Sequence, residues 1–381
     1  MNKFFEIIKD EFRHFISDAG VLLIMIAAVI AYSFWYVMPY QQEVIKEIPV
    51  GVVDLDNTNF SKDFIRDLNI TDVLDINKRC MSIHDAEIAF YKDEIRGFIV
   101  IPKDFERDLL RGQQVDVSVY ADSAYLIVYK TLYSAIAQTS IEMGGRIEVI
   151  KMMKQGIHKK QAINVKKPFE FIQVPLFNSV GGYKSYVYPV ILVLILHQTL
   201  LLGLGLQQGT RNEKKRKYCK KEKDMPFILF ARSTLYVFLY LFYGAVAFFI
   251  FPELFVYPAH YNPLPLIGIF TLMLYAACFF AQTLAYCFRI RESALLIMVV
   301  TSIIFIFIPG LIWPRESIPT LINIFSFFIP ATCGIDGIIK INQNGASFMN
   351  VLYDYLWLMF LCLFYFITAI YFTKKLDKTF E

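Results

Sequence analysis

The stretch GVLLIMIAAVIAYSFWYVM, residues 20–38, is an uncharged apolar run long enough to cross a lipid bilayer. An α-helix rises about 1.5 Å per residue, so about 20 such residues span the roughly 30 Å hydrocarbon core of a membrane. No other run of this kind begins before Tyr186, and five such runs lie in the part of the chain from Tyr186 on. The chain is therefore predicted to be an α-helical polytopic membrane protein with a polar insert, residues 40–185, after its first span.

The composition also indicates a membrane protein that carries a soluble domain. Hydrophobic residues make up 56% of the chain, more than a soluble core needs, whereas charged residues still make up 19%. The insert holds 19 of the 38 basic residues and 20 of the 34 acidic residues. This balance is typical of an ordinary folded surface, so no nucleic-acid partner is expected.

Six spans are predicted, at residues 20–38, 186–206, 227–251, 264–288, 294–313 and 351–372. An even number of spans puts both termini on one side, and short loops rich in Lys and Arg stay in the cytoplasm. Sixteen basic residues lie on the side of the termini, and only Arg315 and Lys340 lie in the short loops of the other side. The segments 1–19 and 373–381 are therefore predicted to be cytoplasmic, and the insert extracytoplasmic.

The insert alternates predicted strands with predicted helices. Strands are expected within residues 49–57, 73–76, 96–102 and 115–122, and helices at 61–68, 82–93, 103–110 and 124–156. This alternation predicts a small α/β domain with a largely parallel sheet. An extended segment, residues 165–176, then leads back to the membrane.

Four polar residues of the insert, Asp54, Asp56, Asp122 and His84, are candidates for a catalytic site because α/β sites form at strand ends. No nucleophile with a base partner, no metal-type spacing and no Gly-rich phosphate loop accompanies them. The favoured interpretation is that the carboxylates cap and turn the chain, with no catalytic or metal site.

Of the six cysteines, only Cys80 and Cys333 fall on the predicted outer side. A disulfide between them stays open as an alternative, although nothing in the sequence places the two thiols together.

Four motifs follow one another in an order that resembles a known family. PVGVVDLDN (49–57), RGFIVIPKDFERDLLRG (96–112) and VDVSVYAD (115–122) combine a strand with an acidic turn or helix, and IPGLIWPRESIPTLINIFSFFIPATCGIDGIIK (308–340) is a proline-punctuated segment before the last span. With the one-plus-five topology, they resemble the permease subunit of a type 2 ABC exporter, of the subfamily with a large extracytoplasmic domain after the first span. The resemblance covers essentially the whole chain.

The resemblance implies a transport subunit and not an enzyme. Such permeases lie in the bacterial cytoplasmic (inner) membrane as homodimers or paired homologues, above a cytoplasmic ABC ATPase that binds ATP and Mg²⁺. This chain has no GxxxxGK[ST] loop, so no cofactor is expected in the chain itself. The implied function is ATP-driven efflux of a hydrophobic or amphipathic substrate, drug-like or lipid-like, and the outer domain would guide release or dock a periplasmic adaptor.

Two cytoplasmic segments are candidates for coupling to the ATPase. Residues 3–16 predict an amphipathic helix along the inner interface, or alternatively a continuation of span one. Its apolar face would comprise Phe4, Phe5, Ile8, Phe12 and Phe15. By resemblance, GTRNEKKRKYCKKEKDMP (209–226) is the coupling segment, and the candidate coupling residues are Arg211, Glu213, Lys214, Lys215, Arg216, Pro226 and Arg232.

The lysine run at residues 214–223 departs from the family pattern, which has a glycine-threonine-leucine stretch there. Two roles stay open for it. One is attraction to anionic lipids, worth about 1 kcal/mol per basic residue near the surface. The other is docking on an acidic groove of the ATPase.

Residues 314–341 contain an apolar stretch that is too short to cross the membrane and is broken by prolines, which predicts a re-entrant segment. The resemblance places it at the outer end of the pathway, with Asp336 near the exit or as an ordinary loop carboxylate. Inside the spans, His197, Gln198 and Gln282 are polar groups that either line the pathway or bond helices together.

A non-transporting membrane receptor or scaffold, whose outer domain binds a surface ligand, is the alternative function. It would need neither an ATPase nor a coupling segment. Co-purification with an ATP-binding subunit, lost on deleting residues 209–224, distinguishes the two functions.

Overall fold

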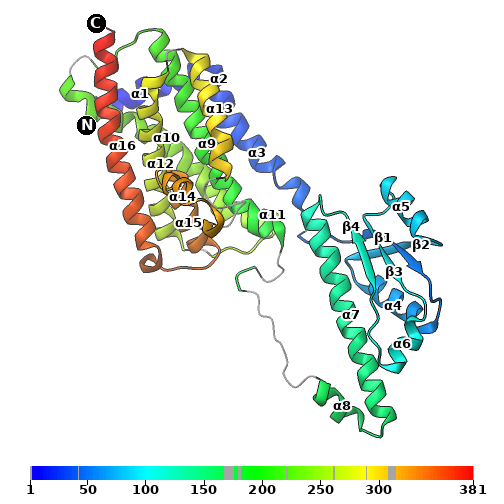
Figure 1. Ribbon diagram of the computed structural model, residues 1–381. Coiled ribbons are helices and arrows are strands. Elements are labelled where there is room, and N and C mark those ends of the chain that lie inside the picture. Colours follow the sequence, from blue (N-terminus) through cyan, green and yellow to red (C-terminus); the bar gives the residue numbers. More distant parts are fainter. Residues whose placement is uncertain are drawn as a thin grey trace. The chain divides into compact units, whose positions relative to one another are not determined.

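The computed structural model describes residues 2–41, 43–166, 176–178, 182–219, 222–260, 262–288, 290–307 and 315–380. The chain divides into two compact units. The helical unit comprises Met1–Glu43 and Pro175–Glu381, and the α/β unit comprises Val44–Val174 (Figure 1). The predicted extended segment at residues 165–176 lies mostly outside the described residues.

The helical unit contains long apolar helices joined by short helical pieces. Its described elements are α1 (Asn2–Ser17), α2 (Ala19–Leu22), η1 (Leu23–Ala28), α3 (Val29–Trp35), η2 (Met38–Tyr40), α9 (Tyr183–Glu213), η3 (Glu222–Asp224), α10 (Met225–Ala245), η4 (Val246–Ile250), α11 (Phe251–Phe255), α12 (Pro263–Leu284), η5 (Ala285–Cys287), α13 (Arg291–Phe307), η6 (Arg315–Ser317), α14 (Thr320–Ser326), α15 (Pro330–Asn342), η7 (Phe348–Val351) and α16 (Leu352–Thr379).

Within the described residues, five helical stretches are long and apolar enough to cross a membrane, and a sixth is added if a bent helix pair counts as one span. The five are Ala19–Tyr40, Tyr183–Glu213, Glu222–Phe255, Pro263–Cys287 and Phe348–Thr379. They contain or overlap the first, second, third, fourth and sixth predicted spans, so the predicted class of polytopic helical membrane protein is confirmed. The fifth predicted span, residues 294–313, corresponds to α13, and residues 308–313 lie outside the described part.

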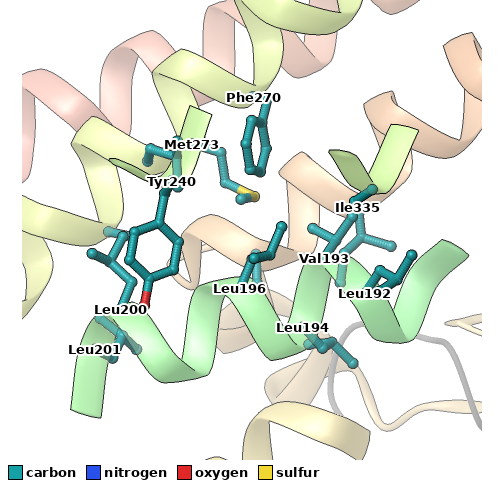
Figure 2. Close-up of a cluster of buried hydrophobic side chains, with 14 of the residues drawn as sticks. Leu192, Val193, Leu194, Leu196, Leu200, Leu201, Tyr240, Phe270, Met273 and Ile335 are labelled. Carbon is teal, nitrogen blue, oxygen red and sulfur yellow. The ribbon is translucent and has the colours of Figure 1, made fainter. Parts of the chain in front are cut away.

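Helix α9 lies at the centre of the helical unit. In its most apolar 18-residue part, 78% of the residues are buried, against 28% in the corresponding parts of the first and last stretches. Leu192, Val193 and Leu196 of α9 belong to one core with side chains of α10, α12 and α15 (Figure 2). Because lipid tails are as apolar as these side chains, close packing must hold the helices together. A Cβ atom at Gly203 would collide with Met25, so glycine lets the first span approach α9.

The helices α14 and α15 form the bent pair, which turns by 82°. Pro330 stands at the start of α15. The first N–H groups of a helix have no partner within the helix, so the missing proline N–H costs no hydrogen bond there. Side chains of α16 satisfy backbone carbonyls at the bend. Trp357 Nε1 donates to the Phe327 carbonyl at 2.7 Å, and the Tyr365 hydroxyl donates to the Phe328 carbonyl at 2.6 Å.

The α/β unit is a four-stranded sheet in the order β2-β1-β3-β4, covered by helices. Its elements are β1 (Ile48–Asp54), α4 (Asn59–Ile70), β2 (Leu74–Cys80), α5 (Ile83–Tyr91), β3 (Gly97–Ile101), α6 (Phe105–Arg111), β4 (Ser118–Ala121), α7 (Leu126–Lys154) and α8 (Lys159–Lys166). Side chains of α4, α6 and α7 share one buried core with the sheet, and side chains of α5 form a smaller core with β1 and β3.

The sheet is largely parallel, as predicted, except at its last strand. Strands β1, β2 and β3 are parallel, whereas β4 runs antiparallel to β3. The register Val100↔Ser118 shows that β4 begins beside the carboxyl end of β3. The seven-residue helix α6 is about 10 Å long, and Gly112 ends it with a positive φ. The chain therefore turns back early and enters β4 from the same end.

Candidate functional site

A buried ionic cluster joins three helices at one end of α9. Arg211 Nη2 of α9 lies 3.1 Å from Glu11 Oε2 of α1, and Arg232 Nε of α10 lies 3.2 Å from the same oxygen. The side chains of Glu11, Arg211 and Arg232 are only 2%, 8% and 13% exposed. Together with Tyr218 and Tyr236, we call these residues the Glu11 network. Two of the candidate coupling residues, Arg211 and Arg232, thus meet at one carboxylate.

Glu11 is not among the residues predicted from the sequence, although its spacing carried a signal. Phe4, Ile8, Glu11 and Phe15 follow one another at steps of four, three and four residues, which places Glu11 inside an apolar helical stripe. In the structure Phe15 is buried and packs edge-on against Tyr236, with ring centroids 6.1 Å apart. A carboxylate in such a stripe needs a buried partner.

The expected apolar face of α1 combines buried and exposed side chains. Phe15 is buried, whereas Phe5 and Phe12 are exposed, and the Phe12 ring stacks on that of Phe15 with centroids 6.4 Å apart. At 3.6 residues per turn all five residues still lie on one side of the helix, so its contact with the membrane interface stays a prediction.

Tyr236 and two guanidinium groups keep Glu11 ionised. The Tyr236 hydroxyl lies 2.9 Å from Glu11 Oε1 and 2.6 Å from Gln207 Oε1. With one hydrogen, it donates to one of these oxygens at a time. Burial alone raises the pKa of Glu11, but Arg211, Arg232 and the Tyr236 hydroxyl outweigh it and hold that pKa below its ordinary value.

Tyr218 anchors the predicted coupling segment to the Glu11 network. Its buried ring lies 4.7 Å from the Arg211 Cζ and 5.3 Å from the Arg232 Cζ, so it stacks with both guanidinium groups. The backbone N–H groups of Tyr218 and Cys219 donate to the two carboxylate oxygens of Asp377, on α16, at 2.9 and 3.2 Å. One aromatic residue inside a basic segment therefore contacts α9 and α10, and its backbone reaches α16.

A second ion pair lies near the same end of α9. The Arg291 guanidinium, at the start of α13, lies 2.6 Å from Asp18 Oδ1 and 2.8 Å from the Thr210 hydroxyl. Asp18 also accepts the N–H groups of Gly20 and Val21, so it caps the first span. The hydrogen bond from Arg291 is the largest cause that lowers the pKa of Asp18. First span, α9 and α13 are thereby connected.

The other candidate coupling residues lie around these two groups. Glu213 accepts the backbone N–H of Arg291 at 3.4 Å, and Pro226 stands in the first turn of α10. Lys214, Lys215 and Arg216 are exposed. The Arg216 guanidinium contacts His14 Nε2 at 3.1 Å, which joins the segment to α1 as well.

Each candidate pathway residue contacts a different set of neighbours. His197 is fully buried in α9, and Gln198 beside it is half-buried. The Gln282 amide donates to the Ser233 hydroxyl at 2.9 Å, so it bonds α12 to α10. Asp336 pairs with Arg315 near the bent helix pair. A substrate could meet His197 or Gln282 only if the helices around them moved apart.

The acidic residues of the α/β unit have the contacts of caps and turns. Asp54 accepts the N–H groups of Asp56 and Asn57 and the Ser61 hydroxyl, at 2.7–3.1 Å. Asp56 accepts the N–H of Glu106, in the first turn of α6, at 3.0 Å. Asp122 accepts the Ala124 N–H at 2.8 Å, and His84 is exposed. Cys80 lies in the α/β unit and Cys333 in the helical unit, each as a free thiol.

Residues 19–371 match the family model described as ABC-2 family transporter protein. A comparison with curated proteins gives no match. The matched residues include all five described stretches that could cross a membrane, apart from the last residues of α16, and the whole α/β unit. Because the match covers most of the chain, the protein belongs to the ABC-2 family of transporter proteins, as a membrane permease subunit.

Proposed function

We propose that this permease is one half of an ATP-driven exporter that moves a hydrophobic or amphipathic substrate outward across the bacterial cytoplasmic membrane. A separate cytoplasmic ATPase binds ATP and Mg²⁺, and a second permease, identical or homologous, completes the pathway. Family membership supports an ATPase partner and pairing. The excess of basic residues beside the termini supports cytoplasmic termini and an α/β unit outside.

The position of Tyr218 is the observation that carries the proposed coupling. The exposed residues Lys214–Lys217 precede it and offer a basic surface to an acidic groove on the ATPase or to anionic lipid headgroups. Tyr218 itself is buried, and its ring contacts both Arg211 and Arg232. A displacement of the segment therefore reaches Arg211 of α9 and Arg232 of α10 through the Tyr218 ring as well as along the chain.

The energies of these contacts decide which parts move together. A cation–π contact is worth about 0.5–2 kcal/mol, whereas removing one partner of a buried ion pair costs about 3–5 kcal/mol. A force that the Tyr218 contact can transmit is thus too small to separate Glu11 from its two arginines. We expect α1, α9 and α10 to move as one group, which parts the helices around His197 and Gln282.

The α/β unit would guide the released substrate or dock a periplasmic adaptor. The bent pair α14–α15 would cap the pathway as a re-entrant segment, with Asp336 near its exit. Support for these roles is the family resemblance of the motifs and the 82° bend. The apolar, aromatic-rich spans favour a hydrophobic or amphipathic cargo.

Co-purification tests the proposal. The tagged chain is purified from its own cells, and bound proteins are identified by mass spectrometry. We expect an ATP-binding subunit with the wild-type chain and its loss when residues 214–217 are all replaced by Glu. The matched control is Lys375→Glu with Lys378→Glu, which reverses charge at exposed positions of α16, outside both candidate coupling segments, and should keep the subunit.

Two results would change the conclusion. Equal loss in the control would assign the basic segment to lipid attraction and not to ATPase docking. A functional chain that purifies without any ATP-binding subunit would contradict the exporter and support a receptor or scaffold.

A further inference from the structure

The two edges of the sheet in the α/β unit differ in how they are protected. Edge strand β2 carries Asp75, Lys78 and Arg79, and the Asn69 side chain already accepts its Ile76 N–H at 2.9 Å. Edge strand β4, with the sequence SVYA, carries no charge. Charged side chains at an edge prevent pairing with other strands, and an uncharged edge lacks this protection.

The hydrogen-bond pattern shows which backbone groups of β4 point away from the sheet. Asp122 N donates to the Arg96 carbonyl at 3.4 Å, so this pair is of the hydrogen-bonded type, and the type alternates along an antiparallel ladder. Ser118 and Tyr120 therefore direct their backbone groups toward β3. Val119 and Ala121 direct theirs outward, as does Val117 where the extended chain enters the strand.

The side chains of this segment alternate in the same way. Val115, Val117, Val119 and Ala121 are half-buried and pack against the core that includes α7. Asp116, Ser118 and Tyr120 are exposed. The alternation of exposed and half-buried side chains begins three residues before β4, which favours an extended course for residues 115–117 as well.

We propose that the β4 edges of two copies of this chain pair antiparallel about a two-fold axis at Ser118. The two α/β units then share one eight-stranded sheet. In this register Val117 exchanges backbone hydrogen bonds with Val119 of the second copy, and Val115 does so with Ala121. On the exposed face, Ser118 meets Ser118 of the second copy, and Asp116 meets Tyr120, a carboxylate beside a phenol.

Charge and side-chain direction select this register over its neighbours. An axis at Val119 would place Asp116 opposite Asp122 of the second copy, and like charges directly opposite destabilise a sheet. A shift of one residue on only one copy would set outward-directed backbone groups opposite groups that point toward β3, so the hydrogen bonds between the copies could not form. The Ser118 axis avoids both costs and uses all of residues 115–121. Self-complementarity of this kind is what a two-fold interface requires.

Disulfide cross-linking of the full chain in membranes tests the pairing. The background carries Cys80→Ser, because Cys80 is the free thiol of the described α/β unit. We expect Ser118→Cys to give a covalent dimer on oxidation, since residues facing each other in a non-hydrogen-bonded pair have Cα atoms about 4.5 Å apart, within disulfide range.

Matched variants separate pairing from random collision. Asp116→Cys or Tyr120→Cys alone should not dimerise, because each would lie roughly 13 Å from its own copy at about 3.4 Å per residue. The two substitutions together should cross-link. Ser118→Lys in that double variant should abolish the band, and Ser118→Thr should keep it.

Absence of the Ser118→Cys dimer, or equal cross-linking of all three single variants, would overturn the proposal. A cross-link from Ser118→Cys to a different protein would also overturn it and would give the edge another occupant. The proposed transport function does not depend on this result, because retention of the ATP-binding subunit is measured separately. A chain that cross-links but binds no ATPase would keep the pairing and lose the exporter.

Discussion

The two ends of α9 both hold a buried cation beside a carboxylate, but they satisfy it differently. At the Lys184 end, Lys184 Nζ lies 3.4 Å from Glu43 Oε1 and donates to the Phe255 carbonyl at 2.8 Å. Glu43 also accepts the Ser185 hydroxyl and N–H, at 2.7 and 3.1 Å. We call Glu43, Lys184 and Ser185 the Glu43 clamp. One acid there faces one base, and both have further polar partners.

At the Arg211 end, one carboxylate serves two guanidinium groups. Arg211 Nη1 and Arg232 Nη1 are buried, and neither has a hydrogen-bond partner among the described residues. The Glu11 network therefore holds more positive charge than its nearest carboxylate can neutralise. The comparison teaches that the Glu43 clamp fixes one end of α9. The other end depends on one carboxylate, Glu11, and is therefore sensitive to any displacement of Glu11.

Replacing Glu11 is expected to give the largest effect. Glu11→Gln keeps the shape of the side chain but leaves two buried guanidinium groups without a carboxylate, which costs about 3–5 kcal/mol. We expect a clear fall in the melting temperature of the purified protein, measured in detergent or nanodiscs. Arg232→Gln is the matched control, because it removes the surplus cation and should lower the melting temperature much less. A Glu11→Gln protein as stable as wild type would contradict the charge imbalance.

Replacing Glu43 is expected to cost less, because its partner keeps other bonds. In Glu43→Gln the amide oxygen can still accept from Ser185, and Lys184 retains the Phe255 carbonyl. The loss is then that of hydrogen bonds to a charged group, about 1.5–3 kcal/mol. The same melting experiment should rank the two variants, with Glu11→Gln the less stable. The reverse ranking would show that the Lys184 end is the more vulnerable one.

Tyr218 sharpens the comparison, because its ring contacts both arginines of the Glu11 network. Tyr218→Leu removes the ring between Arg211 and Arg232, worth about 0.5–2 kcal/mol. We expect trypsin to cleave after the exposed residues Lys214–Lys217 roughly 2- to 30-fold faster, as local opening becomes easier.

Tyr218→Phe is the control for this measurement. It keeps the ring, and the lost hydroxyl makes no well-aligned hydrogen bond to the described residues. Its cleavage rate should equal that of wild type. Fast cleavage in the Phe variant would mean that the hydroxyl, and not the ring, anchors the segment.

The sequence predicted what periodicity and charge can encode, and it missed what depends on contacts between distant residues. Apolar runs located the five described stretches that could cross a membrane, and alternating patterns located the strands and helices of the insert. The antiparallel direction of β4 depended on where the short helix α6 turns back, which no local pattern specifies. Arg211 and Arg232 were found by motif resemblance. Glu11 was not, because its partners lie about 200 residues away and only its place in an apolar stripe pointed to it.

The pair Asp18–Arg291 should give the smallest effect, because its side chains are 17% and 29% exposed and partly exposed pairs contribute about 0–1 kcal/mol. Asp18→Asn keeps a good N-cap residue and removes the charge. The pKa of Asp18 is lower in the folded protein, so ionised Asp18 stabilises the fold at pH values above the ordinary carboxyl pKa of about 3.9. This stability is lost as the pH falls through the pKa of Asp18 in the folded state. Wild type should therefore melt slightly higher than the variant at pH 7, and the gap should close below about pH 4. A difference in melting temperature that persists unchanged in acid would mean that Asp18 acts only as a helix cap. The stabilising charge interactions at this end of α9 would then all belong to the Glu11 network.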